Sequence, residues 1–166
     1  MRIRPERESD VAEILALTRA AFARAAHSSG TEQYIVNALR QAGALTLSLV
    51  AEDAQEIIGH IAVSPVRISD GSSGWYGLGP VSVAPARQRE GTGSGLVMAA
   101  LDSLKGMGAN GCVLLGDPAY YARFGFHPHA SMILPGVPAE YFQVLSFSGR
   151  IPEGEVSYHP AFEVNQ

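Results

Sequence analysis

The sequence has almost no cysteine: Cys112 is the only one among 166 residues, so no disulfide can form within the chain. Cys112 opens the apolar run 112–115, where a thiol behaves as a small core residue in a reducing compartment. The chain also lacks an apolar run long enough to span a bilayer, and its first residues do not read as a signal peptide. We therefore expect a soluble, cytoplasmic protein without a membrane partner.

Positive charge is also scarce, with 12 Lys and Arg against 16 Asp and Glu and a net charge of −4. A surface that holds nucleic acid needs a basic excess, so we expect no nucleic-acid partner. We find no internal repeat, low-complexity tract or linker in the sequence. A length of 166 residues suits one hydrophobic core, so we predict a single domain over residues 1–166.

The spacing of apolar residues gives the order of the elements that the chain does contain. Alternating or short apolar runs predict strands at residues 1–5, 45–52, 57–66, 75–83, 111–115, 141–147 and 156–164, with a hairpin turn at 53–56. Helical spacing predicts helices at 11–23, 31–43, 93–104 and 119–124, the first of them capped by Ser9 or Asp10. This order predicts an α/β fold in which helices flank a central mixed sheet.

The stretch 78–95 is the most informative part of the chain. A predicted strand leads into the basic, glycine-rich turn 87–93, and a helix follows directly. Backbone N–H groups at a helix N-terminus carry partial positive charge, and glycine lets an anion approach them closely. The segment therefore predicts a phosphate-binding turn. Gly77, Gly79 and Pro80 interrupt the preceding strand, which predicts a bulge or a place where a ligand approaches.

Two motifs in this sequence resemble those of the GNAT family of N-acetyltransferases. Residues 88–93 (Gln-Arg-Glu-Gly-Thr-Gly) fit the family signature Q/R-x-x-G-x-G/A, and they follow a strand as that family requires. Residues 121–126 (Tyr-Ala-Arg-Phe-Gly-Phe) fit its downstream element Y-x-x-x-G-F. The sequence of residues 116–126 most resembles a poorly characterised "predicted acetyltransferase" branch of the family.

This resemblance implies acetyl-CoA as a cosubstrate, with no metal. Backbone amides of the turn would hold the CoA pyrophosphate, and the backbone of the preceding strand would pair with the pantetheine arm as an added strand would. The residues expected to bind acetyl-CoA are Val81, Ser82, Val83, Gln88, Arg89, Glu90, Gly91, Thr92, Gly93 and Ser94. His127 and His129 have a spacing that suits a metal, but no carboxylate or cysteine motif accompanies them.

The implied reaction is direct attack of an amine on the thioester. Tyr121 is the expected general acid, because a phenol with a pKa of about 10 can protonate a leaving thiolate with a pKa of about 8.5. The other interpretation of Tyr121 is a core aromatic residue whose hydroxyl finds a partner. A backbone N–H such as that of Val83 would polarise the carbonyl. The general base stays open between a water chain and five side chains: Glu52, Glu56, His60, His127 and His129.

The leading hypothesis is an N-acetyltransferase (an acyltransferase) that acts on a primary amine of a small molecule or peptide. The alternative is a non-catalytic acyl-CoA-binding or regulatory module of the same fold. A nucleotide-binding enzyme is disfavoured, because no Lys-Ser/Thr follows the glycines and no dinucleotide fingerprint is present. The sequence names neither the acceptor nor the oligomeric state, and it leaves a homodimer open.

Overall fold

The computed structural model describes residues 1–25 and 28–165, which fall into two compact units. The first unit comprises Met1–Ser64, Gly79–Leu101 and Pro160–Gln166, and the second comprises Pro65–Leu78 and Asp102–His159. Strand β5 (Trp75–Val83) and helix α3 (Thr92–Gly106) run from one unit into the other. The expectation of one domain over the whole chain stays a prediction.

The first unit is built on antiparallel strands that belong to a six-stranded sheet. Its own elements are β1 (Arg2–Pro5), the 3₁₀ turn Glu8–Asp10, α1 (Val11–Phe22), α2 (Glu32–Gln41), β2 (Leu47–Asp53), β3 (Glu56–Pro65, up to Ser64), and the 3₁₀ turns Pro85–Arg87 and Pro160–Glu163. β1 pairs with β2, and β2 pairs with β3. Ala54 and Gln55 join β2 to β3 with φ of 50° and 68°, a two-residue turn that matches the twist of a hairpin. The predicted hairpin is therefore confirmed.

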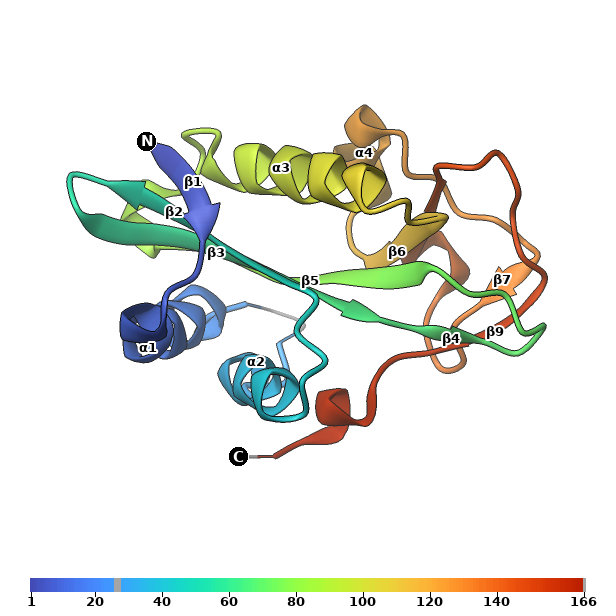
Figure 1. Cartoon of the computed structure of the whole chain (residues 1–166), viewed down its shortest axis with the longest axis horizontal. Coiled ribbons are helices and arrows are strands. Elements are labelled where there is room, and N and C mark those ends of the chain that lie inside the picture. Colours follow the sequence, from blue (N-terminus) through green and yellow to red (C-terminus); the bar gives the residue numbers. More distant parts are fainter. Residues whose placement is uncertain (26–27, 166) are drawn as a thin grey trace. The chain divides into compact units, whose positions relative to one another are not determined.

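Helices cover both faces of the strands in this unit. Figure 1 shows α1 and α2 on one side of β2 and β3, with the start of α3 on the other. The core beneath α1 and α2 contains Ile14, Leu17, Val36, Val50, Ile57 and Ala62. The end of β5 lies beside β3, because the Ala84 amide donates to the Ile58 carbonyl over 2.8 Å.

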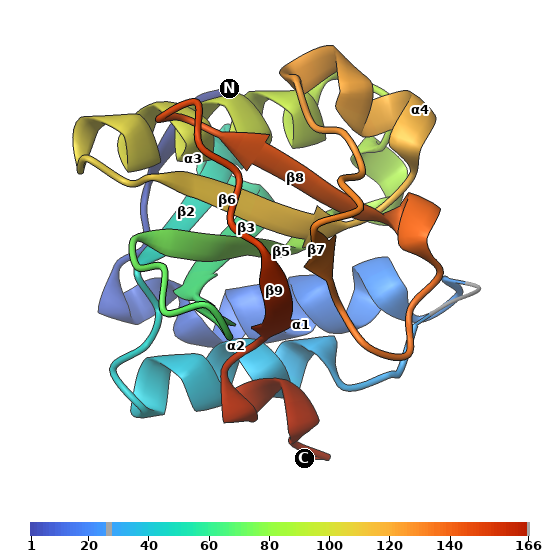
Figure 2. The same ribbon diagram turned by 90° about the vertical axis from the view of Figure 1, so that its right-hand side faces the viewer.

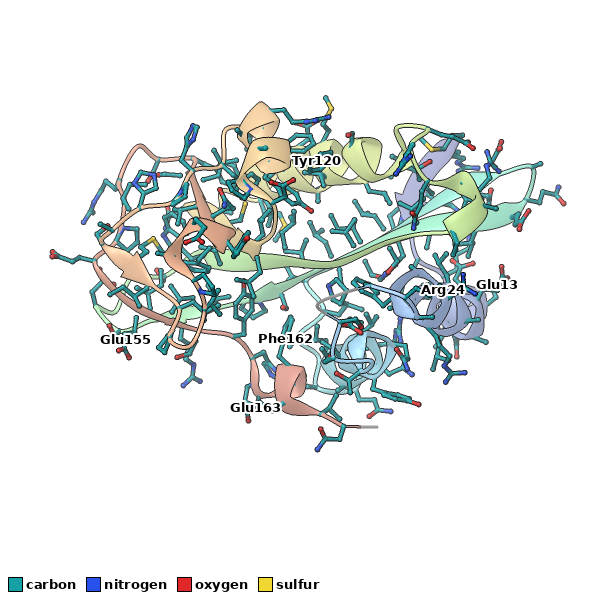
Figure 3. All side chains as sticks on the ribbon, turned by 180° about the vertical axis from the view of Figure 1, so that it is seen from behind. Glu13, Arg24, Tyr120, Glu155, Phe162 and Glu163 are labelled. Carbon is teal, nitrogen blue, oxygen red and sulfur yellow. The ribbon has the colours of Figure 1, made fainter. Side chains whose placement is uncertain are left out.

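The predicted last strand is partly wrong. β9 (Gly154–Ser157) is shorter than expected, and Pro160–Glu163 forms a 3₁₀ turn. Proline has no N–H to donate to a strand ladder, so pairing does not continue through Pro160. Ala161 and Phe162 instead pack on Ile35 and Leu39 of α2 (Figure 3).

The capping prediction for α1 also needs correction. Asp10 stands at the N-cap position, but its side chain makes no capping hydrogen bond to the helix. Its carboxylate instead accepts two hydrogen bonds from the buried Arg4 guanidinium, at 2.7 and 3.2 Å, and one from the Arg7 amide. A buried guanidinium requires anionic partners, and this requirement takes precedence over the cap.

The second unit contains the mixed sheet that the sequence predicted. β5 pairs in parallel with β6 (Gly111–Leu115), and β6 pairs antiparallel with β8 (Phe142–Ser146). A small second sheet joins β4 (Arg67–Ile68), β9 and β7 (Met132–Ile133), and Figure 2 shows β9 beside β7. The other elements of this unit are α4 (Pro118–Tyr121) and the 3₁₀ turns Ala122–Phe124 and Ala139–Tyr141.

Gly77 lies where the ladder between β5 and β6 ends. The last pair is Gly77 with Val113, although β5 itself continues through a cis Gly79–Pro80 bond to Val83. A Cβ atom on Gly77 would stand 3.0 Å from Cδ1 of Tyr158 and 3.2 Å from Val66. The Tyr158 ring is therefore the near neighbour of Gly77, while the predicted bulge or ligand approach at this interruption stays a prediction. No helix within the described residues is long and apolar enough to cross a membrane.

Candidate functional site

The glycine-rich turn presents a helix N-terminus, as the sequence predicted. Arg89 and Gly91 adopt left-handed backbone conformations with φ of 67° and 89°, and this lets the chain reverse into α3. The first hydrogen bond of the helical pattern runs from the Gly95 amide to the Gly91 carbonyl over 3.0 Å. The amides of Thr92 and Gly93, in the first turn, therefore have no acceptor inside the helix and face outward from its N-terminus.

A groove of about 240 Å³ runs along this helix start within the first unit. It brings together six of the residues predicted to bind acetyl-CoA: Val81, Val83, Gln88, Arg89, Thr92 and Gly93. The Gln88 amide donates to the Val83 carbonyl over 3.3 Å and so ties the turn to the strand. Strand and helix N-terminus thus form two walls of one groove.

Four other predicted residues are not among those that line this groove. Ser82 is buried, because side chains along a strand alternate and its neighbours Val81 and Val83 occupy the groove side. Glu90 pairs with Arg87 over 3.0 Å. Gly91 and Ser94 are also not among the residues that line the groove.

The third wall was not foreseen from the sequence. Ala21 and Phe22 at the end of α1, and Ala25 just beyond it, line the same groove. For Phe22 the sequence indicates only a place in the helix predicted at 11–23. No local motif marks these residues, because their position depends on how α1 packs on the sheet.

The two arginines of the turn have different surroundings. Arg87 forms ion pairs with Asp53 over 2.7 Å and with Glu90 over 3.0 Å. The hydrogen bond from Arg87 lowers the pKa of Asp53, and the same contact raises the pKa of Arg87. Arg89 is exposed and lines the groove, and it makes no ion pair with any described residue. Arg89 is therefore the turn's available cation.

Tyr121 lies in the second unit, and its motif has a clear local cause. The Gly125 amide donates to the Ala122 carbonyl over 3.0 Å, and the Phe126 amide donates to the Tyr121 carbonyl over 3.3 Å. With Gly125 left-handed at φ 95°, these two bonds form the Schellman ending of a helix. The rings of Tyr121 and Phe126 meet edge to face, with centroids 6.1 Å apart. The Y-x-x-x-G-F pattern therefore produces a helix end whose hydrogen bonds and ring contact hold Tyr121 in position.

The start of the same helix is also fixed locally. The Asp117 carboxylate accepts a hydrogen bond from the Ala119 amide over 2.9 Å, and Pro118 occupies the first helical position. Asp117 is therefore the N-cap of α4. The Arg123 guanidinium lies 4.2 Å from the centroid of the Tyr120 ring, and Figure 3 labels Tyr120.

The environment of Tyr121 keeps its phenol protonated at neutral pH. Burial, followed by the neighbouring Tyr120 and Asp117, raises the pKa of Tyr121 to about 12. Its hydroxyl makes no hydrogen bond to the residues that the structure describes. The Tyr121 ring packs against Tyr120 and Phe126, so both interpretations, general acid and core aromatic residue, stay predictions.

Two of the five candidate bases have structural roles in the first unit. Glu52 accepts hydrogen bonds from Arg4 at 2.8 and 3.3 Å, and these bonds lower its pKa. His60 is fully buried, and burial lowers its pKa to about 4. Glu56 is exposed at the start of β3, while His127 and His129 lie in the second unit. Cys112 is buried, and burial raises the pKa of its thiol, as a core residue requires.

A cavity of about 620 Å³ shares no residue with the predicted site. It lies in the second unit between the turn Asp70–Ser73 and the loop Ser148–Glu153. Hydrogen bonds connect the turn to the loop, because the Asp70 carboxylate accepts from the amides of Ser72 and Glu153. Among the described residues, no three His, Cys, Asp or Glu side chains cluster as metal ligands would.

The comparisons with known proteins agree with this geometry. A family model described as "Acetyltransferase (GNAT) domain" matches residues 2–129, which include both motifs. The fold and the glycine-rich turn therefore define an acetyltransferase of the GNAT class. The chain belongs to the GNAT family of acetyl-CoA-dependent N-acetyltransferases, as its two motifs predicted.

Similar solved structures include the following two. A GNAT family acetyltransferase from Brucella melitensis, in complex with acetyl-CoA, is 53% identical, with a TM-score of 0.87 over 97% of both chains. YhbS from Escherichia coli, in complex with CoA, is 37% identical, with a TM-score of 0.88 over 98% of this chain and 92% of its own. In the sequence comparison, the uncharacterized N-acetyltransferase YhbS of strain K12 is 41% identical over 127 residues, 76% of this chain and 73% of YhbS.

Proposed function

We propose that this protein transfers the acetyl group of acetyl-CoA to a primary amine of a small molecule or peptide by direct attack on the thioester. The observation that carries the proposal is the groove that joins the end of β5 to the N-terminus of α3. The relatives with known structures support it, since one is a complex with acetyl-CoA and the other a complex with CoA. The lone, buried thiol fits a cytoplasmic location.

Each wall of the groove has a distinct task in holding the donor. The amides of Thr92 and Gly93 face the CoA pyrophosphate, and Arg89 adds a positive charge beside it. The backbone of Val81 and Val83 offers its hydrogen-bonding groups to the pantetheine arm. Phe22 supplies apolar surface on the opposite wall. A groove of backbone donors, one cation and apolar surface suits a ligand that is anionic at one end and amide-rich along its arm.

The chemistry needs a proton on the leaving sulfur and a neutral amine. Tyr121, with its pKa raised to about 12, carries a proton throughout the physiological range and donates it to the departing CoA thiolate. The amine attacks the thioester carbonyl as a free base, so its proton must leave first. We assign that proton to solvent or to Glu56, His127 or His129, because Arg4 engages Glu52 and burial removes His60 from solvent.

The acceptor has its own pocket in this proposal. A second groove of about 290 Å³ shares Phe22 and Ala25 with the donor groove and adds Arg19, Ser28 and Gln33. Because the two grooves have these two residues in common, an amine in the second would approach the donor groove past Phe22. The two shared lining residues support a path between acceptor and donor at the end of α1.

Acetyl-CoA is expected to stabilise the purified protein strongly. A ligand held at about 100 times its Kd adds about 2.7 kcal/mol to the free energy of unfolding. The check is the melting temperature with and without acetyl-CoA, with ATP and NAD as controls for any adenine nucleotide. A rise with acetyl-CoA alone supports the donor site, and no rise at millimolar acetyl-CoA contradicts it. Binding without acetylation of any amine in a broad panel would favour the non-catalytic module.

Arg89→Ala is expected to weaken acetyl-CoA binding about tenfold, because it removes a charge-assisted contact to phosphate. Arg87→Ala is the matched control, since Asp53 and Glu90 already engage that side chain. Its loss should change the Kd less than about twofold, as exposed ion pairs contribute little. Titration calorimetry at low and high salt measures both. Equal losses in the two variants would show that Arg89 has no special role.

A further inference from the structure

Gly59 lies on β3 directly beneath the start of α3. A Cβ atom at this position would stand 2.8 Å from Cγ2 of Thr92, 2.9 Å from Cδ1 of Leu96 and 3.3 Å from the Ser82 carbonyl. Non-bonded carbon atoms rest at about 3.5 to 4.0 Å, so no side chain fits there without movement. Gly59 does not have a positive φ, so space alone requires a glycine.

This contact sets how closely the helix approaches the sheet. Thr92 and Leu96 are both buried, one turn apart on the helix face that meets β3. Thr92 also lines the donor groove, where its amide is one of those at the helix N-terminus. A side chain at position 59 would therefore push on the same turn of α3 that forms the groove.

Gly116 has the same relation to Tyr121 in the second unit. It follows β6 directly, and a Cβ atom there would overlap Cε2 of the Tyr121 ring and lie 2.7 Å from its Cδ2. The backbone of Gly116 also has no positive φ. The ring is already bounded by Phe126, so an added methyl group would force it to rotate or shift. The place of the Tyr121 hydroxyl thus depends on this glycine.

We propose that Gly59 is a positioning residue for the donor groove of the first unit and that Gly116 is a positioning residue for Tyr121 in the second unit. Gly59 lets the helix N-terminus reach the position from which its amides hold the CoA phosphates. Gly116 lets the Tyr121 ring take the position from which it protonates the leaving sulfur. The inference rests on the proposed function. It predicts that one added methyl group weakens acetyl-CoA binding at position 59 and lowers kcat at position 116.

Gly59→Ala is expected to raise the Kd and the KM for acetyl-CoA about tenfold, because overpacking displaces the turn that carries the amides. The kcat at saturating acetyl-CoA should change less than about twofold. Thr92→Ser removes the methyl group that the new Cβ would meet, so the double variant should regain part of the affinity. Leu96→Phe pushes the same surfaces apart from the helix side, and it tests the idea even if Gly59→Ala fails to fold.

Gly116→Ala is expected to lower kcat about tenfold and to leave the Kd for acetyl-CoA unchanged, because the added methyl group displaces the ring that carries the Tyr121 hydroxyl. A double-mutant cycle with Tyr121→Phe isolates the cause. If the glycine acts only through the hydroxyl, Gly116→Ala should have no further effect in the Tyr121→Phe protein. Additive losses would overturn its positioning role.

Gly111→Ala is the matched control for general damage. Its Cβ atom would stand 2.5 Å from Cζ3 of Trp75 and 2.6 Å from the Leu145 carbonyl, and none of these residues belongs to the proposed site. We expect a lower melting temperature with the wild-type Kd and kcat per folded molecule. The inference is wrong if Gly59→Ala binds acetyl-CoA as the wild type does, or if Gly111→Ala changes binding equally. Failure of the wild type itself to bind acetyl-CoA would instead refute the proposed function.

Discussion

Tyr121→Phe is expected to lower kcat about 100-fold, because general acid catalysis contributes factors of this order and the substitution removes the proton alone. The Kd for acetyl-CoA should stay within about twofold of the wild-type value. Phenylalanine keeps the ring that Phe126 and Gly116 surround, so the helix end and the fold should be preserved. The loss should thus appear in turnover and in neither binding nor stability.

The measurement is the rate of CoA release at saturating acetyl-CoA with the best amine from a panel. Tyr120→Phe is the matched control, because it removes a phenol from the adjacent residue and leaves Tyr121 in place. It should retain most of the wild-type kcat. A Tyr121→Phe protein with wild-type kcat would show that Tyr121 is a core aromatic residue and that the sulfur leaves without its help.

The pH profile offers a second check on Tyr121. Because its pKa is raised to about 12, Tyr121 cannot cause a loss of rate between pH 7 and pH 10. If kcat rises across this range, the rise reports loss of the acceptor's proton, and the Tyr121→Phe protein should show the same rise at a lower level. A basic limb near pH 9 that disappears in the variant would contradict the raised pKa.

Local signals explain why much of the site could be predicted from the sequence. The turn at Gly91 and the helix end at Gly125 are both set by residues within a few positions along the chain, and the structure places each as expected. The buried strand Gly111–Leu115 also matches its prediction to the residue. In each case the backbone conformation follows from one short stretch, with no help from distant parts.

Contacts between distant segments could not be predicted in the same way. The spacing of Phe22 indicates a helix face, but only the packed structure shows that this face borders the groove. Gly59 and Gly116 resemble any strand glycine until a neighbouring side chain is seen against them. Asp10 carries a cap signal that a buried arginine overrides. The roles of these residues depend on contacts with residues far away in the sequence, and no short stretch of the sequence reveals those contacts.

The buried side chain of His60 makes the stability of the protein depend on pH, and the groups that face its two ring nitrogens set this dependence. Its Nε2 lies 2.8 Å from the Ser48 hydroxyl, which also bonds to the Glu6 carboxylate. Burial raises the pKa of Glu6, but hydrogen bonds from Arg40 and Ser48 outweigh it and leave that pKa lowered. Glu6 is therefore an ionised acceptor that takes the single hydroxyl proton of Ser48. Neutral His60 must then donate from Nε2.

The other ring nitrogen of His60 has no such partner. Its Nδ1 is buried and makes no hydrogen bond to any described residue. Protonation would place a buried N–H there without an acceptor, close to the positive charge of Arg40. The negative charge of Glu6 opposes this cost but does not overcome it, so burial lowers the pKa of His60 from 6.5 to about 4.

We expect the free energy of unfolding to fall as the pH drops from 6.5 to 4. In this window the unfolded chain binds a proton at His60 and the native protein does not, so acid favours unfolding. The full effect is about 3 kcal/mol, because one pKa unit corresponds to about 1.4 kcal/mol, and about 2 kcal/mol is already lost at pH 5. The stability that Glu6 contributes is lost mainly below its ordinary pKa of 4.5. The change in the free energy of unfolding in the upper part of the window therefore reports His60.

Urea unfolding at pH 7.5 and pH 5 measures this difference. In His60→Gln, a neutral amide can still donate to Ser48 but cannot titrate, so the difference between the two pH values should shrink by about 2 kcal/mol. An NMR titration of the wild-type imidazole gives an independent result, since the His60 ring signals should stay unshifted down to about pH 5. Equal pH dependence in the two proteins, or a His60 signal that titrates near 6.5, would mean that its buried ring is not what links folding to pH.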